Sequence, residues 1–337
     1  MSLTSQLRAS DSPLRAWLGL RLPHLDVAQK RWRREVPAQS GTVGWGRGQG
    51  PAPWPMLGMA IDHRLRFALH NAPDLGVCLT GAKKVQSVCA SPDLASQLEA
   101  LVADVLVHTV PADRSRALLL EPAAEDELGR LCVVLSWMEY VYRQGVPDGP
   151  SQEHQSPLRA GKPAPDLAHM LAGVPAAALD DLRAVTATAQ QGIFDRLRSS
   201  TTFEEVDVGP VFAGSRDVGG ADADWVARGT LLDCKATVSP HRLADTHALY
   251  QLACYPLLDY NDTMKIVTVG IYLARQGLLV KWPLAELLAE LAGDPVDVAE
   301  LRADLRDHLS TKPTRSRTRQ PAHRGPLHAE APRRSRL

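Results

Sequence analysis

The residues best suited to chemistry are three aspartates and a lysine that follow one another at strand spacing in the second half of the chain. Asp222 and Asp224 are two residues apart, and so are Asp233 and Lys235. Because side chains on a β-strand point alternately to the two faces of a sheet, the members of each pair share one face. Two such strands joined by a tight turn would bring three carboxylates and one ammonium group together.

The turn is predicted at Arg228-Gly229, since glycine readily adopts the positive φ that a two-residue hairpin turn requires. Counting outward from that turn places Asp224 opposite Asp233, and Asp222 opposite Lys235. Directly opposed residues have Cβ atoms about 5 Å apart, and like charges at that distance are destabilising. A cation between Asp224 and Asp233 would remove this cost, so the hairpin predicts a divalent-metal site.

Composition indicates a globular protein with a sizeable core, because 45% of the residues are hydrophobic and 23% are charged. The formal net charge is zero, yet the segment 310–337 holds eight Lys or Arg and a single Glu. The body of the chain is therefore acidic, and the basic tail is predicted to be disordered. Such a tail either holds phosphates through salt-sensitive attraction or is merely solvated.

Cysteine usage and hydropathy indicate the compartment. The five cysteines are scattered without a C-x-x-C pair, which argues for a reducing environment and against a zinc or iron–sulfur site. The N-terminus lacks the apolar core of a signal peptide, and no run approaches the roughly 18–20 apolar residues of a membrane span. We therefore expect a cytoplasmic protein that does not enter a membrane.

Hydrophobic spacing predicts a helical first part and a mixed α/β second part. Helices are predicted over 57–69, 93–107, 125–142 and 176–197, before a helix that ends near Tyr260 and one or two in 283–309. Strands are predicted, besides the hairpin, over 203–212, 265–273 and 278–282. Glycine and proline clusters predict loops over 40–55 and 145–165.

In order and approximate spacing the chemical residues resemble the PD-(D/E)XK nuclease superfamily, and most closely its RecB-like and CRISPR-adaptation exonucleases. In that branch a strand aspartate precedes a D/E-x-K strand, and a helix with a Q-x-x-x-Y motif follows. The matching residues here are Asp224, Asp233-Cys234-Lys235, and Gln251 with Tyr255.

The resemblance implies a restriction-endonuclease-like α/β core, in which helices flank a mixed central sheet. It covers residues 203–282 and is weaker elsewhere. The expected organisation is an N-terminal helical or loop segment 1–56, a helical region 57–200, a nuclease core 201–309 and a basic tail 310–337.

RecB-like members usually also carry an upstream helix in which a histidine follows a glycine by four residues and joins the metal site. Here Gly58 has that spacing to Asp62, and His63 is the next residue. Either Asp62 or His63 could ligate the metal, and the carboxylate is the better match for Mg²⁺. Gln191 is a second candidate for the place of that histidine, although its side chain carries no charge. An ordinary amphipathic helix with a solvated Asp-His-Arg surface would account for the same residues.

The resemblance implies that Asp224 and Asp233 hold Mg²⁺ or Mn²⁺, with the backbone carbonyl of Cys234 as a further ligand. Such an ion lowers the pKa of a bound water and stabilises charge on the phosphate. Lys235 would position that water or stabilise the developing negative charge, or else form a structural ion pair with Asp222.

The helix that follows would contribute Gln251 and Tyr255, which share one helix face at i, i+4 spacing. We expect them to orient Lys235 or to contact the nucleic-acid backbone. The alternative is that Tyr255 is a core residue and Gln251 lies at its rim.

These features together predict a metal-dependent, exonuclease-like enzyme that cleaves single- or double-stranded DNA in repair, recombination or defence. The iron–sulfur cysteines that some members of the family carry are missing here, because no cysteine follows Cys254. No iron–sulfur cluster is therefore expected. Two alternatives stay open. One is a catalytically silent nuclease fold that acts as a nucleic-acid-binding or assembly subunit. The other is a helical scaffold in which Asp224 and Asp233 are neutralised by Lys235 or an arginine.

Overall fold

A computed structural model describes residues 2–36, 52–89, 93–109, 117–149, 155–245 and 247–310. Within these ranges the fold is mixed α/β, with thirteen α-helices, one 3-10 helix and a single five-stranded sheet. The predicted change from a helical first part to a mixed second part is confirmed, because ten helices precede the first strand. The basic tail from residue 311 onward and most of the predicted loop 40–55 lie outside the described residues.

The sheet is an open one in which the strands follow chain order. Its strands are β1 (Val206–Val208), β2 (Trp225–Ala227), β3 (Thr230–Lys235), β4 (Thr268–Leu273) and β5 (Leu278–Pro283). Strands β1, β2 and β3 form an antiparallel meander, β4 runs parallel to β3, and β5 is antiparallel to β4. The parallel step needs a crossover connection, which α11 (Ala248–Leu258) provides.

One predicted strand is much shorter than expected. Strand β1 covers three residues of the predicted range 203–212. Gly209 follows it with a φ of +70°, and Pro210 has no N–H to donate, so the ladder stops there. The ends of β4 and β5 agree with the prediction to within a few residues.

Ten helices precede the sheet in the described chain. They are α1 (Leu3–Arg8), α2 (Pro13–Arg21), α3 (Leu25–Glu35), α4 (Trp54–Leu69), α5 (Gly76–Cys89), α6 (Leu94–Thr109), α7 (Pro122–Gln144), α8 (Leu167–Ala172), α9 (Ala176–Gln191) and α10 (Ile193–Ser199). A proline in the first turn favours the start of both α4 and α7. The predicted helix 176–197 is two helices, because Gly192 between them adopts an extended conformation.

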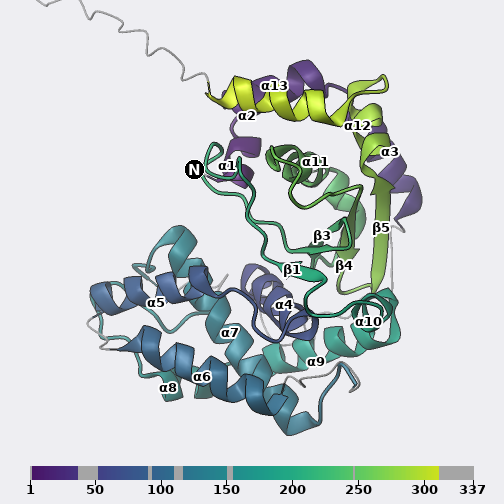
Figure 1. The fold of residues 1–337 in the computed structure, drawn as a ribbon. Helices are drawn as coiled ribbons and strands as arrows, with labels where there is room; N and C mark the ends of the chain where they lie inside the picture. The colour runs from purple at the N-terminus through teal and green to yellow at the C-terminus, as the bar shows by residue number, and fades with distance from the viewer. Residues whose placement is uncertain are drawn as a thin grey trace, which may run out of the picture.

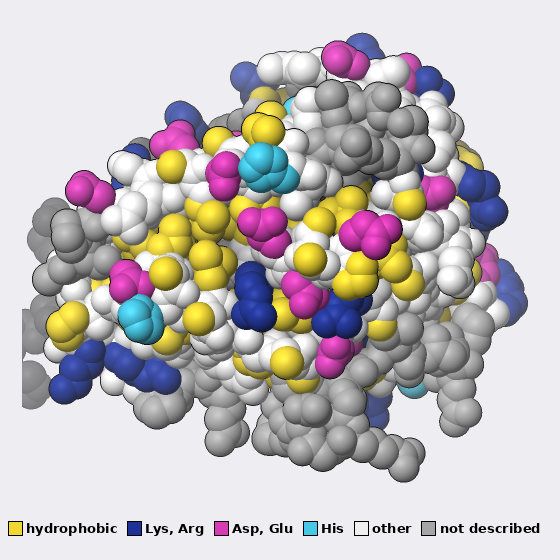
Figure 2. Space-filling view, turned by 90° about the horizontal axis from the view of Figure 1, so that it is seen from below, with side chains coloured by type: hydrophobic (Ala, Val, Ile, Leu, Met, Phe, Trp, Pro, Cys, Tyr) yellow, Lys and Arg dark blue, Asp and Glu magenta, His cyan; other side chains and the backbone are white. Residues whose placement is uncertain are grey.

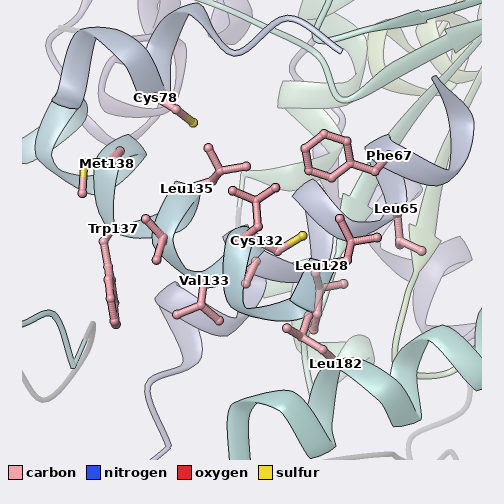
Figure 3. Close-up of a cluster of buried hydrophobic side chains, with 14 of the residues drawn as sticks. Leu65, Phe67, Cys78, Leu128, Cys132, Val133, Leu135, Trp137, Met138 and Leu182 are labelled. Atoms are coloured by element: carbon pink, nitrogen blue, oxygen red, sulfur yellow. The ribbon is translucent and has the colours of Figure 1, made fainter. Parts of the chain in front are cut away.

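Each face of the sheet is buried by a different group of helices (Figure 1). Trp225, Leu232 and Tyr272 belong to a hydrophobic cluster with helices α4 to α10, and Figure 3 shows some of its side chains on α4, α5, α7 and α9. Their strand neighbours, among them Val226 and Leu231, belong to a second cluster on the opposite face. This alternation is what strands buried on both faces require.

The second cluster joins the two ends of the described chain. It contains residues of α1 to α3 together with α11, α12 (Leu284–Ala292) and α13 (Val298–Ser310). Trp32 stacks on Trp282 with ring centroids 6.0 Å apart, and the Trp17 indole donates to Asp304 at 2.7 Å. Figure 1 accordingly shows α13 alongside α2. The N-terminal helices therefore pack on the same sheet as the C-terminal ones.

Candidate functional site

The predicted hairpin and its turn are present. Arg228 and Gly229 both have positive φ, at +47° and +72°, as a two-residue turn with right-handed twist requires. Trp225 pairs with Leu232, so Asp224, the residue just before β2, reaches the position opposite Asp233. The hairpin thus brings two aspartates together at its open end, where β2 begins.

Asp224 is held at the edge of β3 by its own side chain. Its Oδ2 accepts a hydrogen bond from the backbone N–H of Cys234 at 2.5 Å. The N–H and C=O of one strand residue point to the same edge, so the Cys234 carbonyl also points toward Asp224. The backbone carbonyl that the sequence offers as a ligand therefore lies on the side of the aspartates.

Asp233 and Lys235 form an ion pair with Oδ2 and Nζ 2.6 Å apart. The side chain of Asp233 is 2% exposed and that of Lys235 is 24% exposed. Burial raises the pKa of Asp233 to about 6, and the charge of Asp224 adds to this while Lys235 opposes it. The pKa of Lys235 is raised because the two aspartates outweigh the effect of burial. Asp233 thus ionises at a higher pH than an ordinary aspartate, even with the Lys235 ammonium beside it.

The predicted pairing of Asp222 with Lys235 is wrong. Asp222 lies outside β2 and forms an isolated bridge with Val211. Its carboxylate lies 3.2 Å from the guanidinium of Arg143 on α7. The printed β2–β3 pairs end at Trp225 with Leu232, and the bridge to Val211 lies on the β1 side of β2, where Gly209 also donates to the Asp224 carbonyl.

Helix α11 places Tyr255 beside the two aspartates. The Gln251 amide donates to the Tyr255 hydroxyl at 2.6 Å, so the predicted i, i+4 pair is formed. Burial raises the pKa of Tyr255 well above its usual value, and the charges of Asp233 and Asp224 raise it further. The hydroxyl is therefore a neutral group that accepts a hydrogen bond from Gln251.

The two candidate ligands on α4 point to different places. Asp62 lies 2.6 Å from Nε of Arg66, whose Nη2 lies 3.3 Å from Asp224. His63 instead lies with its Nε2 3.0 Å from Glu139 on α7. Consecutive residues on a helix are separated by about 100°, so one of them faces the hairpin and the other the neighbouring helices. Asp62 joins the hairpin aspartates through Arg66, and His63 does not. Gln191 is exposed at the C-terminal end of α9.

The donor set near the hairpin suits Mg²⁺ or Mn²⁺, because both ions prefer carboxylate and carbonyl oxygens. Asp62 Oδ1 is buried without a hydrogen-bond partner, and burial raises the pKa of Asp62, with Asp224 adding to the effect. A cation would relieve both costs. Arg66 now lies between Asp62 and Asp224, so it would have to withdraw before both could bind one ion directly.

Within the described ranges, one group of three ligand side chains has all its ligand atoms within 4.8 Å of one another. That group is His63, Cys78 and Glu139, and it does not include the hairpin aspartates. Sequence reasoning missed Glu139, Arg143 and Arg66. Their signal is the i, i+4 spacing of Asp62 with Arg66 and of Glu139 with Arg143, which also occurs on solvated helices.

Comparison of the chain with family models, with curated proteins and with solved structures gave no significant match. Among the helices in the described ranges, none combines the length and the apolar character needed to cross a membrane.

Proposed function

We propose that the chain is a metal-dependent DNA nuclease of the PD-(D/E)XK type. The observation that carries the proposal is the convergence of Asp224, Asp233 and Lys235 on one hairpin, with Tyr255 of the next helix beside them. The antiparallel meander, the crossover helix and the parallel strand after it give these residues the order that the resemblance implies. Exonuclease-like action in repair, recombination or defence is part of the same proposal.

Asp224, Asp233 and the Cys234 carbonyl would hold Mg²⁺ or Mn²⁺. When bound, the ion would lower the pKa of a water and stabilise charge on the scissile phosphate. The Lys235 ammonium, fixed by Asp233 on the same strand, donates hydrogen bonds to the attacking water or to the phosphate oxygen that gains charge. The Tyr255 hydroxyl supplies a neutral donor beside them.

The charge balance around the hairpin supports a bound cation. Leaving out Glu139, which contacts His63, four carboxylates and three basic groups are linked or adjacent there, namely Asp62, Asp222, Asp224 and Asp233 with Arg66, Arg143 and Lys235. Carboxylates are therefore in excess there, and a cation would offset the excess. On the coloured part of the face seen from below in Figure 2, Lys and Arg are interspersed with Asp and Glu. We therefore expect this face to attract DNA phosphates at single sites rather than over its whole surface.

The test is cleavage of linear and circular DNA, single- and double-stranded, with Mg²⁺, Mn²⁺ or EDTA. We expect cleavage that requires metal and falls by about 100-fold or more in Asp233→Asn. Asp207→Asn, an exposed carboxylate on β1, is the matched control and should keep full activity. Equal rates of DNA cleavage by the intact protein and by Asp233→Asn would contradict the nuclease assignment.

A catalytically silent, DNA-binding form of the same fold is the second candidate. The observation that favours it is that side-chain cations already neutralise the aspartates: Arg66 contacts Asp62 and Asp224, and Lys235 contacts Asp233. This form would bind DNA in EDTA with a fluorescence anisotropy change and would cleave no DNA with either metal. Stimulation of cleavage by Mn²⁺ would exclude it.

A further inference from the structure

A second cluster of ligand side chains is buried where three helices meet. His63 on α4, Cys78 on α5 and Glu139 on α7 come together there, in the part of the core where both α4 and α5 pack on α7. The side chain of His63 is 3% exposed and that of Glu139 10%, and Cys78 is fully buried within the cluster shown in Figure 3. Polar groups this deep need partners that compensate for lost hydration.

The three ligand atoms have the arrangement of metal ligands rather than of a proton relay. The Cys78 sulfur lies 3.7 Å from His63 Nε2, and the Glu139 Oε2 lies 3.0 Å from the same nitrogen. A nucleophile–histidine–acid relay uses the two different ring nitrogens. Burial also raises the pKa of the Cys78 thiol well above its usual value, so without a metal the thiol is protonated and a poor nucleophile.

The distances fit a tetrahedral ion with bonds of about 2.3 Å to sulfur and about 2.1 Å to nitrogen and oxygen. Such bonds place nitrogen and sulfur about 3.6 Å apart, and nitrogen and oxygen about 3.4 Å apart. The observed nitrogen–sulfur distance of 3.7 Å agrees with this value, and the nitrogen–oxygen distance of 3.0 Å would have to lengthen by about 0.4 Å. The sulfur and the carboxylate oxygen lie within 4.8 Å of each other.

Charge and ligand softness select the class of ion. A thiolate and a carboxylate balance one divalent cation, so the loaded cluster with neutral His63 would be uncharged in its buried position. Sulfur and imidazole ligands suit zinc and similar ions, whereas Mg²⁺ takes oxygen ligands. The other Glu139 oxygen contacts Arg143 at 2.7 Å, which is the outer-sphere support typical of a metal-binding carboxylate.

We propose that His63, Cys78 and Glu139 bind one zinc-like divalent ion that ties α4, α5 and α7 together. A water would take the fourth position, entering from the side of Arg143, which is 38% exposed. The site is separate from the hairpin aspartates and does not depend on nuclease activity. Because α4 carries Asp62 on its other side, the ion would fix the helix that presents Asp62 to the hairpin.

Cobalt substitution tests this directly on the full chain. Metal-stripped protein is titrated with Co²⁺, whose bond to a thiolate gives a charge-transfer absorption band, and Zn²⁺ is then added to displace it. We expect one Co²⁺ per chain with that band, loss of the band on adding Zn²⁺, and a zinc-induced rise in Tm.

Matched variants locate the site. In Cys78→Ser the band should disappear, and Zn²⁺ affinity should fall by more than the roughly 10–100-fold that loss of an outer-shell partner costs. Cys132→Ser replaces a buried thiol on α7 that is not one of the three ligands, and both this variant and Asp233→Asn should keep the band. Absence of the band in intact protein, or its persistence in Cys78→Ser, would overturn the proposal. The intact-protein result decides even where a variant fails to fold.

Discussion

Replacing Asp233 by asparagine should make the metal-free protein more stable at neutral pH and leave it unchanged in acid. Asp233 is buried beside Asp224, and its pKa is raised from the ordinary 3.8 to about 6. Between these values the native state keeps a proton that the unfolded state has lost, so the free energy of unfolding falls as the pH rises. The full cost is reached above about pH 6 and is absent below about pH 4.

The size of this effect follows from the pKa. One pKa unit corresponds to about 1.4 kcal/mol, so the rise from 3.8 to about 6 corresponds to about 3 kcal/mol. Asparagine has the same shape and does not titrate. The stability of Asp233→Asn minus that of the intact protein should therefore grow by about 3 kcal/mol from pH 4 to pH 7.

Urea unfolding in EDTA, followed by circular dichroism at several pH values, measures both free energies. Titrating groups that do not interact with Asp233 are common to the two proteins and cancel in the difference, and loss of the Lys235 ion pair shifts the whole curve of the variant while Lys235 stays protonated. Mn²⁺ at about 100 times its dissociation constant should return about 2.7 kcal/mol to the intact protein and much less to the variant. Parallel stability curves from pH 4 to pH 7 would refute the reasoning that burial raises the pKa of Asp233 in the folded protein.

Three further predictions follow from single contacts. Mn²⁺ affinity, measured by calorimetry, should be about tenfold weaker at pH 5 than at pH 7, because Asp233 with a pKa of about 6 must lose its proton to bind. Arg275→Met should lower the free energy of unfolding in urea by about 3–5 kcal/mol, because it leaves buried Asp181 without its two 2.7 Å bonds. Gly81→Ala should lower Tm and cost at least about 1–3 kcal/mol, because a Cβ there would collide with the Met138 carbonyl on α7.

Each of these has a control in the same chain. Affinity for Mn²⁺ that is flat from pH 5 to pH 7 would contradict the first. Arg183→Met breaks a more exposed ion pair with Asp126 and should lower the free energy of unfolding by no more than about 1 kcal/mol. An equally small loss of stability in Arg275→Met would contradict the second prediction. Gly58→Ala on α4 meets nothing within 4 Å and should stabilise by up to about 1 kcal/mol, the opposite sign from Gly81.

Local patterns predicted the hairpin well because its information is local. Turn chemistry at Arg228-Gly229 and alternation along two strands determine which residues oppose one another. The prediction was wrong at Asp222, whose carboxylate contacts Arg143 on α7, while Lys235 pairs with Asp233. Arg143 lies 79 residues from Asp222 along the chain, so the spacing of the aspartates carries no sign of this contact.

The wider site could not be read from the sequence because its members meet through helix packing. Arg66 reaches Asp224, and Glu139 reaches His63, across long sequence separations that no spacing rule encodes. Helix α5, which the hydrophobic pattern did not reveal, supplies Cys78 to the group that it forms with His63 and Glu139. The same packing explains why scattered cysteines argued against a zinc site, since His63 and Cys78 lie on different helices and form no compact motif.

The most direct test of the central claim is Mn²⁺-dependent cleavage of end-labelled linear DNA by the intact chain beside Lys235→Ala. The account predicts cleavage by the intact chain that EDTA stops, and none by the variant, although calorimetry still shows Mn²⁺ bound to its two aspartates. Cleavage by both proteins at equal rates, or by neither with Mg²⁺ or Mn²⁺, would contradict it.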